Sequence, residues 1–187
     1  MTKTASKIRF RAKLFRPATT PTRSRGSWTF LTLPKDASAK LPSRGMTSVE
    51  GTLNGFAFQT TLEPDGQGGH WLKVDRKMRE TAGAEAGDLV TLEMAPAAVE
   101  PEPEMPDDLR KALAAASQNA SDTWSDITPL ARRDWIHWIT SGKRTETRAK
   151  RIDVAISKLS SGDRRPCCFD RSGMYGKSLS GPVADDT

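Results

Sequence analysis

Cysteine and histidine are scarce in this chain of 187 residues. The only two cysteines, Cys167 and Cys168, are adjacent, and neighbouring cysteines seldom bridge because the ring they would close is strained. A disulfide framework is therefore excluded, and a reducing cytoplasm is the compartment that we expect. The two histidines, His70 and His137, lie far apart without ligand spacing around them, so we expect neither a metal nor a cofactor.

Long hydrophobic runs are also missing. No stretch approaches the length of a secretory-signal core or a membrane span, so we expect a soluble protein that is not exported. Residues 1–27 hold eight basic residues and no acidic one, a composition that an organellar transit peptide also has. Within them, however, apolar and basic residues alternate from Ile8 to Leu14, which is typical of a half-buried strand.

Charge of one sign is concentrated in separate parts of the chain. Residues 1–99 carry 15 basic and 9 acidic groups, and residues 110–160 carry 10 basic and 5 acidic groups. Between them, residues 100–109 carry five acidic groups and no basic one. The pattern predicts two basic modules separated by an acidic linker. A formal net charge of +6 favours polyanions such as nucleic acid, although only weakly.

Short strands separated by turns dominate the first half of the chain. Alternation of apolar and polar residues predicts strands at 8–14, 28–33, 47–53, 56–60, 71–74 and 89–94. Short helices are expected at 34–41 and 75–82, and Asn54-Gly55 is the strongest signal for a two-residue hairpin. Strands of this length and spacing predict a small β-barrel.

A weak internal repeat supports a closed barrel. Residues 28–49 and 71–90 each read strand, short helix, strand, with few identities, so chance similarity is an open alternative. The aligned core positions are Leu31 with Leu72, Leu33 with Val74, and Val49 with Val90. Because half a barrel leaves strand edges unpaired, we expect the two copies to pair within one chain and share one core. Trp28 and Trp71 are then expected at the two ends of that core.

The second half is predicted to be helical. A Pro/Glu spacer at 96–106 precedes a helix that begins at Asp107-Asp108, and Trp124 and Ile127 are assigned to a short connecting segment. Thr128-Pro129 then begins a helix that ends at Ser141-Gly142. A final helix runs from about Thr145 to Ser161-Gly162, and its apolar stripe consists of Ile152, Ala155, Ile156 and Leu159.

Basic residues gather on this last helical hairpin, which makes it a candidate site for polyanions. The candidate binding residues are Arg132, Arg133, Lys143, Arg144, Arg148 and Arg151. The alternative is a solvated helix face on which Glu146 and Asp153 pair locally with the arginines. Trp135 and Trp138 fit a helix core better than a platform for stacking bases, and His137 between them is expected to face outward.

Catalytic patterns are not found. His70 with Asp65 or Asp75 could form an acid–base pair, but no nucleophile completes the set. The glycines from Gly66 to Gly69 are not followed by the Lys-Ser/Thr of a phosphate-binding loop. We therefore expect a protein that is not an enzyme.

Several motifs resemble known families. WLKVDRKMRETAGAEAGDLVTLEM (71–94) is similar to the strand–helix–Gly-Asp–strand unit of AbrB/MazE-type double-split barrels, with Asp75 where those proteins usually have proline. The motifs VEGTLNGFAF (49–58), EPDGQGGHWLKVDRKMRETAG (63–83) and GKRTETRAKRI (142–152) resemble the bacterial YdeI/OmpD-associated family. That resemblance implies a small barrel domain of unknown function, at about 8–95, followed by a helical domain. It also implies protection from bacteriocins or antimicrobial peptides and association with an outer-membrane porin.

The expected fold class is α+β. We predict a small β-barrel of the double-split type at 1–95, a linker at 96–106, a helical domain at 107–162 and a flexible tail at 163–187. Two functions remain open: binding of nucleic acid or another polyanion through the basic hairpin, or a stress-protection adaptor that acts through a protein partner. The sequence does not indicate an oligomeric state.

Overall fold

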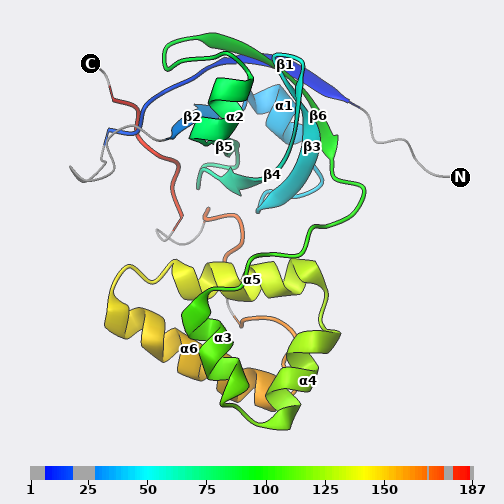
Figure 1. Cartoon of the computed structure of the whole chain (residues 1–187), viewed down its shortest axis with the longest axis vertical. Helices are drawn as coiled ribbons and strands as arrows, with labels where there is room; N and C mark the ends of the chain where they lie inside the picture. Colours follow the sequence, from blue (N-terminus) through cyan, green and yellow to red (C-terminus); the bar gives the residue numbers. More distant parts are fainter. Residues whose placement is uncertain (1–6, 19–27, 168, 175–178, 186–187) are drawn as a thin grey trace, which may run out of the picture. The chain divides into compact units, whose positions relative to one another are not determined.

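The computed structural model describes residues 7–18, 28–167, 169–174 and 179–185 (Figure 1). The described residues form two compact units: residues up to 98 together with those from 170 onward, and residues 99–169. The first unit is a β-barrel and the second is helical, so the predicted α+β class is confirmed. The chain therefore leaves the barrel unit, builds the helical unit and then returns to the barrel unit.

The barrel consists of six antiparallel strands in the order β1-β6-β3-β4-β5-β2. Their bounds are β1 Ile8–Lys13, β2 Thr29–Thr32, β3 Thr47–Leu53, β4 Phe56–Pro64, β5 His70–Val74 and β6 Leu89–Pro96. A bridge between Phe15 and Phe30 joins the continuation of β1 to β2. Because β1 and β2 are the two outer strands of the sheet, this bridge brings the barrel close to closure.

Two short helices, α1 (Lys35–Ala39) and α2 (Arg76–Thr81), follow β2 and β5. The carboxylate of Asp75 caps α2 by accepting the backbone N–H of Met78 at 2.8 Å, and α2 lies within the helix predicted at 75–82. The hairpin between β3 and β4 also forms as predicted. Asn54 and Gly55 there both have positive φ, 49° and 88°, as a type I′ hairpin turn requires.

The internal repeat is borne out by the strand pairing. One copy is β2-α1-β3 and the other is β5-α2-β6, and β2 pairs with β5 while β3 pairs with β6. The six aligned residues share one buried core: Leu31, Leu33, Val49, Leu72, Val74 and Val90. The expectation that Trp28 and Trp71 lie at opposite ends is wrong, because their ring centroids are only 6.4 Å apart. Both indoles stand on the outer side of the neighbouring strands β2 and β5, which brings them together.

The helical unit contains α3 (Asp107–Ala114), α4 (Gln118–Asp126), α5 (Pro129–Thr140) and α6 (Thr145–Ser160). Helix α4 corrects the prediction of a short connecting segment. Its apolar face consists of Ala120 and Trp124, one turn apart, in an otherwise polar sequence, so the hydrophobic period was too weak to identify it. The predicted bounds of α5 and α6 are confirmed, and Thr128 caps α5 through the N–H of Ala131.

Described residues near the end of the chain bond to the barrel. The N–H of Gly181 donates to the Asp65 carbonyl at 3.3 Å, and the N–H of Ala18 donates to the Val183 carbonyl at 2.8 Å. A Cβ placed on Gly181 would lie 3.6 Å from the indole of Trp71. The segment 179–185 thus lies against the barrel beside Trp71.

Candidate functional site

The six predicted binding residues lie in different environments, and four of them contact other parts of the helical unit. Arg132 lies beside the end of α4, where Nε donates to the Trp124 carbonyl at 3.0 Å and Nη2 donates to the Ser125 carbonyl at 2.8 Å. Its Nη1 also donates to Glu102 at 2.7 Å. Arg132 therefore satisfies the last carbonyls of α4, which have no partner inside the helix.

Arg133 is buried on α5, with 7% of its surface exposed. It pairs with Glu100, while the adjacent and equally buried Asp134 faces Arg165 at 3.4 Å. A buried charge needs a partner because leaving water is costly. Arg133 consequently has a structural role, because its buried side chain is not accessible to a polyanion.

Arg148 reaches from α6 to the start of α3. Its Nε and Nη2 donate to the two carboxylate oxygens of Asp108 at 2.6 and 3.1 Å. These hydrogen bonds lower the pKa of Asp108 and raise the pKa of Arg148. The paired geometry is the strong form of an arginine–carboxylate contact.

Arg151 folds back onto the end of α5. Its Nη1 donates to the Trp138 carbonyl at 2.5 Å and to the Ser141 hydroxyl at 2.7 Å. The guanidinium carbon also lies 5.4 Å from the centroid of the Trp138 ring. Arg151 thus links α6 to the last turn of α5.

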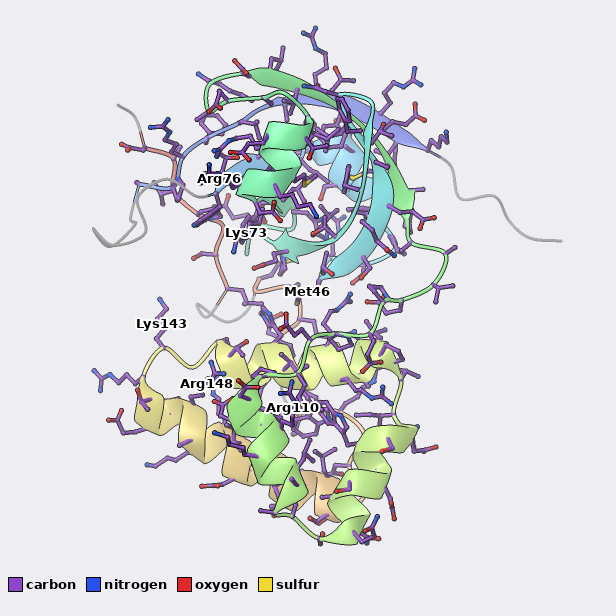
Figure 2. The ribbon with its side chains drawn as sticks, in the orientation of Figure 1. Met46, Lys73, Arg76, Arg110, Lys143 and Arg148 are labelled. Carbon is purple, nitrogen blue, oxygen red and sulfur yellow. The ribbon has the colours of Figure 1, made fainter. Side chains whose placement is uncertain are left out.

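Lys143 and Arg144 are the two candidates left exposed. They lie in the loop between α5 and α6, and Figure 2 shows Lys143 projecting away from it. Among the described residues, neither side chain has a hydrogen-bond or ion-pair partner. The structure therefore does not bring the six residues together into one basic surface. The acidic segment 100–108 supplies carboxylates for three of them.

The two histidines are enclosed. His70 is fully buried, its Nδ1 2.5 Å from the Ser38 hydroxyl and its Nε2 2.9 Å from the Gly45 carbonyl, and burial lowers its pKa. The side chain of His70 is thus hydrogen-bonded to a serine and a backbone carbonyl, not to Asp65 or Asp75. His137 packs against Phe169 with ring centroids 5.4 Å apart, so the expectation that it faces outward is wrong. Within the described residues, no group of histidine, cysteine and acidic side chains could hold a metal ion.

A groove in the barrel wall is the feature that sequence reasoning missed. Strand β4 pairs with β3 along seven positions but with β5 only at Glu63–Trp71 and Pro64–His70. Beyond these pairs the strands separate, and a cavity of about 370 Å³ opens between β4 and the β5–α2 segment. Its lining includes Leu53, Phe56, Phe58, Lys73, Lys77 and Met78.

Among the described residues, the β4 edge of this groove has backbone groups that pair with no neighbouring strand. Leu53 and Phe56 flank the hairpin turn and are paired in register, so they form a hydrogen-bonded pair and the pattern then alternates along the strand. The peptide groups of Ala57, Gln59 and Thr61 therefore point away from β3 and into the groove.

The β5 edge of the groove also has backbone N–H and C=O groups that point toward β4. Phe30 exchanges both backbone hydrogen bonds with Phe15, at 2.8 and 2.9 Å, so its peptide groups face away from β5. Lys73 stands opposite Phe30 and directs its own N–H and C=O away from β2, toward β4. In the part of the chain that the structure describes, the β4–β5 ladder does not extend to Lys73.

Apolar and basic side chains share the groove. Phe56 is 51% exposed at the rim, and Phe58 and Met78 are half-buried against the barrel core. Lys73 Nζ lies 5.3 Å from the centroid of the Trp28 ring, and Figure 2 shows Lys73 and Arg76 near the start of α2. An unpaired strand edge next to exposed apolar side chains is the kind of surface to which another chain binds.

Barrel and helical unit together define a two-part α+β protein, and comparison with family models identifies both parts. Residues 10–94 match a domain of unknown function, DUF1905. Residues 102–162 match the model described as "Bacteriocin-protection, YdeI or OmpD-Associated". These two matches agree with the small barrel domain and the YdeI/OmpD-associated helical domain that the motifs of the chain suggested. No curated protein matches it.

The described residues include no helix that is long and apolar enough to cross a membrane.

Proposed function

We propose that this protein is a non-enzymatic adaptor that acts by binding a segment of a protein partner in the groove between β4 and β5. The observation that carries the proposal is the pair of unpaired strand edges that face each other across an exposed apolar lining. Sheet edges of this kind are normally covered or blocked because they accept other strands. The bacteriocin-protection name of the matched family also favours action through a partner.

The placement of the polar residues supports an adaptor over an enzyme. His70, Ser38 and the Gly45 carbonyl satisfy one another inside the barrel, where Ser38 and His70 are 2% and 0% exposed. A catalytic base must come within hydrogen-bond reach of a substrate. This serine–histidine pair instead joins α1, β5 and the loop before β3.

Capture of partners from a lysate of the source organism tests the proposal. The full chain is immobilised beside Phe56→Asp, which places a charge at the groove rim. The matched control is Leu89→Asp, because Leu89 is an equally exposed apolar residue (53%) on the barrel outside the groove. We expect Phe56→Asp to lose captured proteins that wild type and Leu89→Asp retain after nuclease treatment. Retention of the same proteins by Phe56→Asp would contradict the proposal, provided that all three fold with matching thermal transitions.

Polyanion binding through the α5–α6 loop is the second candidate, favoured by the exposure of Lys143 and Arg144. A site of two cations predicts weak binding with a shallow dependence on salt. Charge reversal of both residues should abolish retention of nucleic acid at low salt, while Lys35→Glu, at an exposed site on the barrel, should not. Equal retention by both variants would exclude the loop as the site.

A further inference from the structure

From the groove geometry we infer that the occupant is an extended peptide segment that adds to β4 as a new strand, with acidic and apolar residues alternating. This inference rests on the proposed function and specifies its ligand. The backbone part follows from the edge of β4. Ala57, Gln59 and Thr61 present their N–H and C=O groups at every second position, which is the spacing that an incoming strand requires.

The apolar half of the pattern follows from the floor of the groove. Phe58 lies opposite Gly51 on β3, and Gly51 in turn lies opposite the buried Met94 on β6. Partners in register share one face of the sheet, so Phe58 stands on the core side of β4 and packs against the barrel core beside Met78. Alternate side chains of an added strand would point toward this face. Apolar side chains there would complete the burial of Phe58 and Met78.

The acidic half follows from the charged groups around the groove. Lys73 stands on the outer side of β5, and Lys77 is exposed on α2. Asp75 also lines the groove, but its carboxylate is engaged by the N–H of Met78 at 2.8 Å. Arg76 pairs with Glu80 at 2.6 Å. Glu63 pairs with Trp71 where β4 meets β5, and burial raises its pKa against the opposing effect of the Lys73 charge.

The outward side chains of the added strand would therefore meet two lysines. Asp75, the acid in the lining, is already bound to the start of α2. The first 99 residues as a whole carry 15 basic and 9 acidic groups, so their long-range field also attracts anionic segments. Charge complementarity at the rim thus selects acidic side chains, while the floor selects apolar ones.

Three fluorescein-labelled peptides of about seven residues, a common strand length, test the inference against the full chain. They alternate valine with glutamate, with lysine or with threonine. We expect the glutamate peptide to bind about tenfold more tightly than the threonine peptide, because two exposed ion pairs supply roughly that factor. Lys73→Glu with Lys77→Glu should reverse the order of the glutamate and lysine peptides.

Backbone pairing is tested separately. Gln59→Pro removes an N–H that points into the groove while leaving the ladder to β3 intact, and Gln59→Ala is its matched control. We expect Gln59→Pro to abolish binding of the glutamate peptide and Gln59→Ala to preserve it. Methylation of alternate peptide nitrogens in the ligand should abolish binding as well. In NMR spectra of the wild-type chain, titration with the glutamate peptide should change the backbone amide chemical shifts of Ala57, Gln59, Thr61 and Lys73.

The outcomes separate this inference from the adaptor proposal. Equal affinity for all three peptides, with loss in Gln59→Pro, would overturn the acidic preference alone. Absence of amide shifts with every peptide would overturn strand addition, even if Phe56→Asp still loses captured partners. Partner capture that is unaffected by Phe56→Asp would overturn the adaptor proposal itself.

Discussion

Arg148 on α6 and Asp108 at the start of α3 form a bidentate ion pair, with N–O distances of 2.6 and 3.1 Å. Arg148 was a candidate for binding an external anion, but it binds the carboxylate of Asp108 within the same chain. The same holds for Arg132 and Arg133, whose partners are Glu102 and Glu100. The acidic segment that the sequence predicted as a spacer thus pairs with three arginines of the hairpin.

A double-mutant cycle measures this contact. Arg148→Ala and Asp108→Ala should each destabilise the chain modestly, and the coupling between them should be about 0.5 kcal/mol. The figure is small because the two side chains are 34% and 42% exposed, so water screens their charges. Urea unfolding gives the free energies, and Lys150→Ala, at an exposed position on the same helix, should be neutral. A coupling of zero would show that the pair contributes nothing to stability.

Shared packing of the two strand–helix–strand copies predicts matched losses of stability. Val49 and Val90 are both 0% exposed in one core, so Val49→Ala and Val90→Ala should each cost about 1–3 kcal/mol through lost burial and a residual cavity. Denaturant unfolding checks this, with Lys40→Ala as the exposed control. A neutral result at either valine would contradict a common core.

Burial of His70 predicts a pH dependence of stability. Burial lowers the pKa of this imidazole below its ordinary value of 6.5, so the unfolded chain takes up a proton at a higher pH than the native chain. Stability should therefore be full above about pH 7 and fall as the pH drops through 6.5 toward the native pKa.

Urea unfolding at several pH values measures this slope. His137 has a lowered pKa for the same main cause, burial, so the test uses His137→Gln, which leaves His70 as the only histidine. The slope should persist in His137→Gln and flatten when His70 is also replaced by Gln. A slope that survives the double replacement would assign the effect to carboxyl groups.

Contacts of the segment 179–185 predict that the end of the chain stabilises the barrel. Deleting the residues after 169 removes the bonds to Ala18 and Asp65 and uncovers Trp71, so tryptophan emission should shift to the red and the unfolding midpoint should fall. Val183→Ser is the control, because that side chain is already 73% exposed. An unchanged midpoint after deletion would instead favour the flexible tail that composition predicts.

Local patterns were sufficient to predict most of the fold. Alternation identified the strands, and Asn54-Gly55 and Thr128-Pro129 located the hairpin and the start of α5 because each acts through its own backbone. Helix α4 was missed since Ala120 and Trp124 are too few to reveal a period. This helix depends on burial against α6. The hydroxyls of Ser117 and Ser160, at the end of α6, are hydrogen-bonded, and the Asn119 amide donates to the Ser160 carbonyl.

The candidate site was less predictable because it depends on long-range pairing. The sequence shows that Arg148 is basic, but not that Asp108, forty residues earlier, meets it. The groove likewise arises where β4 and β5 stop pairing after Glu63 and Trp71. The sequence around Phe58 and Lys73 does not reveal that the two strands lack backbone hydrogen bonds to each other at these positions. One signal was present in the acidic segment 100–109, because its negative charge is complementary to the positive charge of the hairpin.

The return of the chain to the barrel at residue 170 orders events during synthesis. The helical unit, residues 99–169, is complete in sequence before 179–185 leave the ribosome, and helical units with local contacts form quickly. The barrel therefore acquires this last contact late, and until then Trp71 lacks the neighbour that Gly181 provides. A nascent chain stalled between the helical unit and this final segment would lack that contact.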